Sequence, residues 1–108
     1  MATVRGILAQ SNPAAGVLTD IYTCPASKNC TGRVIVTNRG TATNFRISIA
    51  INGAADSNEQ YITYDKAIAT NDTGSTIAFM MGDTDVLRVE AANATLSFSF
   101  TGVEQDNP

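Results

Sequence analysis

The chain contains no histidine and no tryptophan among its 108 residues. The absence of histidine removes the side chain that most often serves as general base, proton shuttle or metal ligand near neutral pH. The absence of tryptophan removes the usual aromatic platform for stacking a sugar ring, so only Tyr22, Tyr61 and Tyr64 can take that part. Both absences argue against an enzyme and leave a sugar-binding site with few residues to use.

Charge is scarce as well, at 16% of residues with a net charge of −3. The basic residues stand singly along the chain, so no basic run is present to neutralise phosphates, and no nucleic-acid partner is expected. No apolar run approaches the roughly 20 residues of a membrane-spanning helix. Residues 1–16 lack the apolar stretch of a signal peptide. We therefore expect neither a membrane partner nor a cleaved leader.

What the chain does have is alternation of apolar with small or polar residues. The segments 45–51 and 96–100, FRISIAI and LSFSF, alternate almost without error, which indicates strands with one buried face. Shorter apolar runs predict further strands, which turn residues separate; these runs are 3–9, 17–24, 31–38, 60–64, 76–81 and 86–91. The pattern predicts one all-β domain over 1–108: an antiparallel β-sandwich, jelly-roll or immunoglobulin-like, with about seven or eight short strands.

The same pattern predicts which residues lie inside. The expected core is Val34, Val36, Phe45, Ile47, Ile49, Ile51, Ile77, Phe79, Leu87, Val89, Leu96, Phe98 and Phe100. The residues between these positions, including Arg46, Ser48, Ser97 and Ser99, are expected on the solvent faces of their strands. Outside the strands we expect a possible N-terminal arm, 1–16, and a polar tail, 104–108.

Acidic residues gather in the predicted turns, at Asp56, Glu59, Asp72, Asp83 and Asp85. Paired carboxylates can bind Ca²⁺ or hydrolyse a glycoside, but acids in turns more often accept backbone hydrogen bonds. No motif of a serine hydrolase, a phosphate-binding loop or a zinc hydrolase is present. We therefore expect no catalytic, cofactor-binding or metal-binding residues and no cofactor.

The two cysteines, Cys24 and Cys30, flank the turn PASKN. They form a possible intrachain disulfide, which in the chain-entropy model stabilises by roughly 2 kcal/mol. Two reduced thiols, as is usual for a protein made in a bacterial cytoplasm, are the second alternative. A bond between subunits is the third. The spacing leaves all three open, and C-x₅-C without other ligands is poor evidence for zinc.

Several segments in a fixed order resemble those of a known family. They are residues 6–29, 36–56, 60–74 and 83–104, with the turn Tyr22-Thr23-Cys24-Pro25-Ala26-Ser27-Lys28, the Asn-Arg-Gly turn, the Gly-Ala-Ala-Asp loop and the aromatic last strand. On these elements the chain resembles virion-associated structural proteins of tailed bacteriophages over nearly its whole length. Members usually carry an aliphatic residue where Cys24 stands, so Cys24 and Cys30 suggest an added cross-link.

The resemblance implies a non-enzymatic structural protein located in the virion and made in the host cytoplasm. Such a protein would decorate or connect the particle at the capsid surface, the neck or collar, or the tail, as a symmetric homo-oligomer. Its partners would be major capsid, neck, collar or tail proteins. The alternative is a carbohydrate- or receptor-binding β-sandwich displayed on the phage surface, which would rely on the three tyrosines and the acidic loops.

Overall fold

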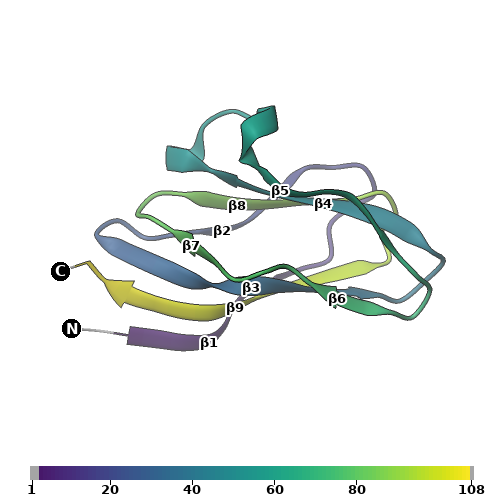
Figure 1. Ribbon diagram of the computed structural model, residues 1–108, viewed down its shortest axis with the longest axis horizontal. Coiled ribbons are helices and arrows are strands. Elements are labelled where there is room, and N and C mark those ends of the chain that lie inside the picture. Colours follow the sequence, from purple (N-terminus) through teal and green to yellow (C-terminus); the bar gives the residue numbers. More distant parts are fainter. Residues whose placement is uncertain (1–2, 108) are drawn as a thin grey trace.

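The protein is an all-β sandwich of two antiparallel sheets, seen edge-on in Figure 1. The computed structural model describes residues 3–107. Sheet A contains β1 (Thr3–Ser11), β9 (Leu96–Asp106), β3 (Lys28–Asn38), β6 (Thr73–Ser75) and β7 (Phe79–Met81). Sheet B contains β2 (Thr19–Thr23), β8 (Val86–Ala91), β4 (Thr43–Ala50) and β5 (Tyr61–Ile68). Two 3₁₀ turns, η1 (Ile51–Gly53) and η2 (Asn58–Gln60), separate β4 from β5. Within residues 3–107, neither turn approaches the length of a membrane-spanning helix.

The connections cross from one sheet to the other at every step except β4 to β5 and β6 to β7. The strand orders are β1-β9-β3-β6 in sheet A and β2-β8-β4-β5 in sheet B, and β7 also pairs with β3. If β6 and β7 are counted as one interrupted strand, this is the eight-stranded jelly-roll order, so the jelly-roll alternative is confirmed over the immunoglobulin-like one.

Crossing between sheets also determines how the chain turns after β8. Residues 92 and 93 can close a tight hairpin, but β8 and β9 belong to different sheets and do not pair. The chain instead passes over the end of the sandwich.

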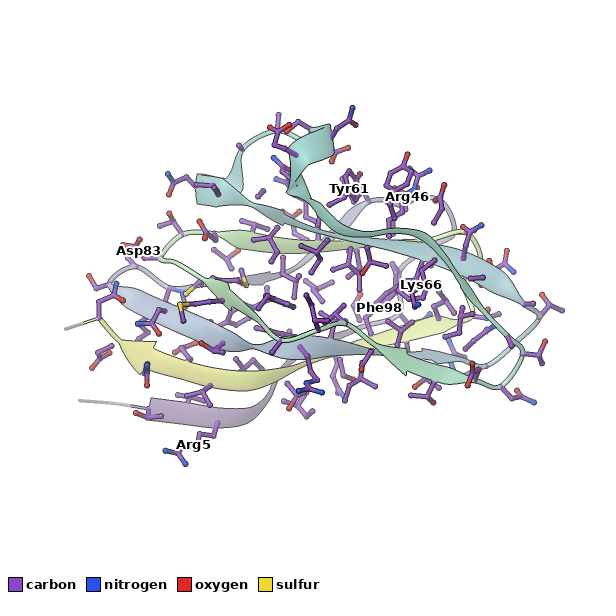
Figure 2. The ribbon with its side chains drawn as sticks, in the orientation of Figure 1. Arg5, Arg46, Tyr61, Lys66, Asp83 and Phe98 are labelled. Atoms are coloured by element: carbon purple, nitrogen blue, oxygen red, sulfur yellow. The ribbon has the colours of Figure 1, made fainter. Side chains whose placement is uncertain are left out.

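The interior is aliphatic and aromatic, and Phe98 lies between the sheets (Figure 2). Nine predicted core residues are confirmed as buried, namely Val34, Val36, Phe45, Ile47, Leu87, Val89, Leu96, Phe98 and Phe100. Ile49 and Phe79 are partly buried against them. Two predictions were wrong, since Ile51 is 70% and Ile77 82% exposed. Ile51 begins the η1 turn, and Ile77 lies in the break between β6 and β7.

The outer face of β4 differs from the expected solvent face. Arg46 remains partly exposed, but Ser48 and Ala50 are fully buried. The segment between β4 and β5 folds back over this end of the strand, because η2 contacts β4 and Gln60 is buried there. The alternation of buried and exposed residues along β4 therefore ends at Ser48, where the segment between β4 and β5 covers the strand in place of solvent.

Both ends of the chain are more ordered than predicted. Thr3–Ser11 is not an arm but the edge strand β1, which pairs with β9. Residues 104–106 are not a loose tail, because β9 continues to Asp106 between β1 and β3. Backbone pairing on both sides fixes residues 104 and 105, and Asp106 pairs with Lys28. Figure 1 shows the start of β1 and the end of β9 at the same end of the sandwich. Residues 1–2 of the predicted arm and residue 108 of the predicted tail lie outside the described part of the chain.

Candidate functional site

The tyrosine candidates for ligand binding separate into two places. Tyr61 and Tyr64 lie together on β5, with ring centroids 5.1 Å apart and planes nearly perpendicular at 87°. Tyr22 lies elsewhere, with its ring 5.2 Å from that of Phe100. The predicted site of three tyrosines therefore contains only two, with Asn58 as their neighbour around a shallow hollow of about 470 Å³.

Tyr61 and Tyr64 are three residues apart, so regular alternation along a strand would place them on opposite faces, and the pairing of β5 explains why they nevertheless meet. The register between β4 and β5 shifts twice, between the pairs Phe45–Lys66, Ile47–Thr63 and Ser48–Tyr61. Each shift adds one residue to β5, and a β-bulge turns the side chains that follow it. Asp65 takes a left-handed conformation, with φ of 49°, at this irregular point.

Arg46 holds the outer part of this aromatic cluster in place (Figure 2). Its guanidinium carbon lies 4.2 Å from the centroid of Tyr64, within cation–π range. Its Nε donates to Asp65 Oδ1 at 2.6 Å, and a second nitrogen donates to Oδ2 at 3.3 Å. This hydrogen-bonded pair lowers the pKa of Asp65 below its ordinary value, so the carboxylate is ionised at neutral pH.

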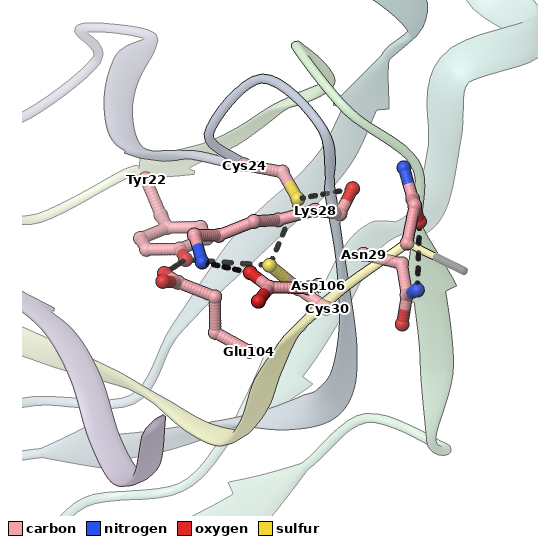
Figure 3. Close-up of polar contacts among 8 residues, drawn as sticks. Tyr22, Cys24, Lys28, Asn29, Cys30, Glu104 and Asp106 are labelled. Atoms are coloured by element: carbon pink, nitrogen blue, oxygen red, sulfur yellow. Dashed lines mark hydrogen bonds and ion pairs between the residues drawn. The ribbon is translucent and has the colours of Figure 1, made fainter. Parts of the chain in front are cut away.

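The second cluster lies between the sheets at the end of the sandwich where β1 begins and β9 ends, and it contains the two cysteines (Figure 3). Cys24 follows β2, Cys30 lies in β3, and both are fully buried. Their sulfurs are 2.9 Å apart and both residues are free thiols. The disulfide is therefore not formed in this structure, although the two sulfur atoms that it would join lie close together.

Polar groups surround the thiols. The Tyr22 hydroxyl donates to the Glu104 carboxylate and lies 3.3 Å from the Cys30 sulfur. Burial, aided by these two contacts, raises the pKa of the Tyr22 phenol, so the phenol is neutral at physiological pH. Because its single proton goes to Glu104, the Cys30 thiol must be the donor to the Tyr22 oxygen. Lys28 and Asp106 form an ion pair beside this group.

Four of the five predicted turn acids accept hydrogen bonds from backbone or hydroxyl groups, and Asp83 lies exposed in its turn. Asp85 accepts from the backbone N–H groups of Gly82 and Asn52, and Asp72 accepts from that of Thr73. Asp56 and Glu59 accept from the hydroxyls of Tyr61 and Ser57. Within residues 3–107, no group of three or more cysteine or acidic side chains is placed to hold a metal ion.

Exposed apolar side chains mark the edges of the two sheets. On one side, Ile62 and Tyr64 of β5 and Ile77 beside β6 line a hollow of about 350 Å³. Met80, on the neighbouring strand β7, is 71% exposed. On the other side, Val4 and Ile7 of β1 are about half exposed. Sequence reasoning missed the exposed position of Ile77 on the first side because it assigned this residue to the core.

The comparisons with known proteins bear on the fold. No family model and no curated protein matches the chain. A solved chain from the structure of infectious bursal disease virus, Gx strain, is similar, with a TM-score of 0.52 and 12% sequence identity over 95% of this chain. This chain spans about 31% of the length of that viral chain. The similarity supports an all-β sandwich fold.

Proposed function

We propose that this protein is a non-enzymatic structural subunit of a tailed-bacteriophage virion, bound to neighbouring virion proteins and to copies of itself in a symmetric oligomer. The observation that carries the proposal is a row of exposed apolar residues along one edge of the sandwich. We call it the β5–β6 edge, and it consists of Ile62 and Tyr64 of β5, Ile77 after β6 and Met80 of the adjoining β7. These large apolar side chains are 42–82% exposed. Exposed apolar side chains beside open strands favour contact with another protein surface.

Two further observations support this role. The jelly roll is a fold that viral shells use, and the similar chain comes from a virus structure. The sequence resemblance to virion proteins of tailed phages points the same way. The partner would be a capsid, neck, collar or tail protein, and the particle would hold many copies in symmetric positions.

The test is incorporation into particles. Tagged wild-type chain, the double variant Ile77→Asp with Met80→Asp, and Val17→Asp are each expressed during infection by the encoding phage. Tagged protein is then quantified in gradient-purified particles by mass spectrometry. Val17 is a matched control, because it is 51% exposed in the loop before β2, which lies at the opposite end of the sheet B strand order from β5. Circular dichroism establishes that each variant folds.

Wild type and Val17→Asp should enter particles equally. The double variant should fall more than about tenfold, because two buried charges at a contact cost several kcal/mol. Equal incorporation of the double variant would show that the β5–β6 edge is not the contact. Absence of the wild-type chain from particles would overturn the structural role itself.

A second candidate function is glycan binding at Tyr61, Tyr64 and Asn58. The observation in its favour is that two β-bulges in β5 bring both rings together at a hollow that Asn58 of η2 also lines. Aromatic rings with polar tips suit the mixed apolar and polar surface of sugars. On an array of bacterial surface polysaccharides, wild type and Tyr64→Phe should bind and Tyr64→Ala should not. No signal for wild type would rule this function out.

A further inference from the structure

The buried cysteine pair joins parts of the chain that belong to different sheets. Cys24 directly follows β2 of sheet B, and Cys30 is the third residue of β3 in sheet A. No β2–β3 pairing exists, so backbone hydrogen bonds between these two strands do not hold the crossing together. Side chains at the crossing therefore have a structural part to play.

The distance between the thiols places them within reach of a bond. Their sulfurs are 2.9 Å apart, about 0.9 Å longer than a disulfide, so small side-chain movements close the gap. The connecting turn is closed by a hydrogen bond from the Lys28 N–H to the Pro25 carbonyl, and Ser27 takes a left-handed φ of 64°. The turn thus holds both cysteines in position before any bond forms.

The surroundings favour the thiol form over a reactive thiolate. Burial first, and then the hydrogen bond with Cys30, raises the pKa of Cys24 well above its ordinary value. The nearby Lys28 ammonium is paired with Asp106 and does not offset this effect. Both sulfurs are fully buried, so oxidation requires transient opening of the turn and proceeds slowly. A slow, one-time oxidation suits a structural bond and not a catalytic dithiol.

We propose that Cys24 and Cys30 form an intrachain disulfide when the protein meets an oxidising medium, linking sheet A to sheet B at this end of the sandwich. With a peroxide as oxidant, one thiolate attacks a peroxide oxygen, which gives a sulfenic acid and, after protonation, one water. The second sulfur attacks the sulfenic sulfur, forms the S–S bond and displaces a second water. Two thiols lose two electrons and two protons, and one hydrogen peroxide becomes two waters.

The bond would reinforce the end of the sandwich at which β1 begins and β9 ends. There, Thr3 pairs with Gln105 and Lys28 pairs with Asp106 in the sheet. Glu104, which Tyr22 engages, lies in β9 next to Cys30 in β3. The cross-link acts independently of the proposed virion role, and it would stabilise the subunit wherever the medium is oxidising.

The experiment uses the full chain, reduced with dithiothreitol, desalted and treated with hydrogen peroxide. Intact mass after denaturation and alkylation counts the free thiols. The expected oxidised product is a monomer on a non-reducing gel, lighter than the reduced chain by two hydrogen atoms and without alkyl groups. Its Tm should lie about 10 °C above that of the reduced chain, as a small closed loop predicts.

Cys30→Ala and Cys24→Ala are the matched controls, and neither should show a rise in Tm on peroxide treatment. The wild-type mass and alkylation results stand even where a variant fails to fold. Two alkylated thiols after oxidation, disulfide-linked dimers, or an unchanged or lower Tm in the oxidised monomer would each overturn the proposal.

Discussion

A single asparagine organises one end of the sandwich. Asn38, at the end of β3, is 1% exposed. Its Nδ2 donates to the carbonyls of Thr41 and Ala69 at 2.9 and 3.1 Å, and its Oδ1 accepts from Gly40 N–H and the Thr95 hydroxyl, both at 3.0 Å. Three separate loops therefore depend on one side chain. The sequence marks this residue only as part of an Asn-Arg-Gly turn, because nothing local shows that distant loops converge on it.

Replacing this side chain should cost stability well beyond the ordinary effect of a surface change. Asn38→Ala leaves buried carbonyls and an N–H without partners, so we expect a loss of about 3 kcal/mol in the free energy of unfolding. Urea denaturation measures it. Asn44→Ala, at an exposed strand position, is the control and should change stability by less than about 0.5 kcal/mol. An equal loss of unfolding free energy in the two variants would contradict an organising role for Asn38.

The Arg46–Asp65 pair predicts a pH dependence of stability. The pKa of Asp65 is lowered in the folded protein, so its contribution is present above the ordinary aspartate pKa and is lost as pH falls through the lowered value. The Tm of Asp65→Asn should therefore lie below that of wild type at pH 7. The two values should converge as the pH falls below the lowered pKa of Asp65.

The difference in Tm between wild type and Arg46→Gln should also narrow at low pH, since Arg46 is the partner that lowers the pKa of Asp65. A residual difference should remain, because the cation–π contact with Tyr64 is lost at every pH. The measurement is Tm by calorimetry across the pH range. A gap between wild type and Asp65→Asn that stays constant down to the lowest pH would contradict the ion-pair explanation.

At the scale of elements, three glycines form a row across sheet A. Gly6, Gly102 and Gly32 lie opposite one another on β1, β9 and β3. A Cβ on Gly102 would lie 2.1 Å from the Thr31 carbonyl oxygen, and one on Gly32 would lie 2.1 Å from that of Thr101. The backbones of β3 and β9 therefore approach each other too closely for any side chain at this pair.

Gly102→Ala should accordingly separate the two central strands and cost about 3 kcal/mol, near the upper end for overpacking. Gly74→Ala in β6 is the matched control, because a Cβ there meets no atom within 4 Å. The readout is the midpoint of thermal unfolding for both variants. Comparable stability of the two variants would show that sheet A tolerates a wider spacing.

Strands were predictable where one face is buried throughout, and less so where another segment changes the environment. The pattern at 96–100 correctly identified β9, and Phe98 and Phe100 are fully buried. Of the strand expected at 76–81 only Phe79–Met81 forms. Residues 76–78 are the break after β6, where the Thr76 hydroxyl accepts the N–H of Val34 in place of a backbone carbonyl. The meeting of Tyr61 and Tyr64 depends on bulges in the pairing with β4, which no local pattern contains.

At the scale of the whole molecule, the sandwich has two edges whose strands pair with a neighbour on one side only. β1 and β2 form one edge pair, and β5 with β6 and β7 forms the other. The interior is filled by side chains, and the described pockets are shallow hollows at the surface. Apart from the buried cysteine pair, the groups available for binding a partner therefore lie on the outside of the molecule, in keeping with our proposal that it acts as a building block of a particle.

The most direct test is a cryo-electron microscopy map of intact particles of the phage that encodes this chain. Our proposal predicts density that fits the jelly roll at symmetry-repeated positions, with the β5–β6 edge against a neighbouring protein. The same map shows whether Cys24 and Cys30 are bonded. A well-resolved map of the complete particle with no density that fits this chain would contradict the structural role.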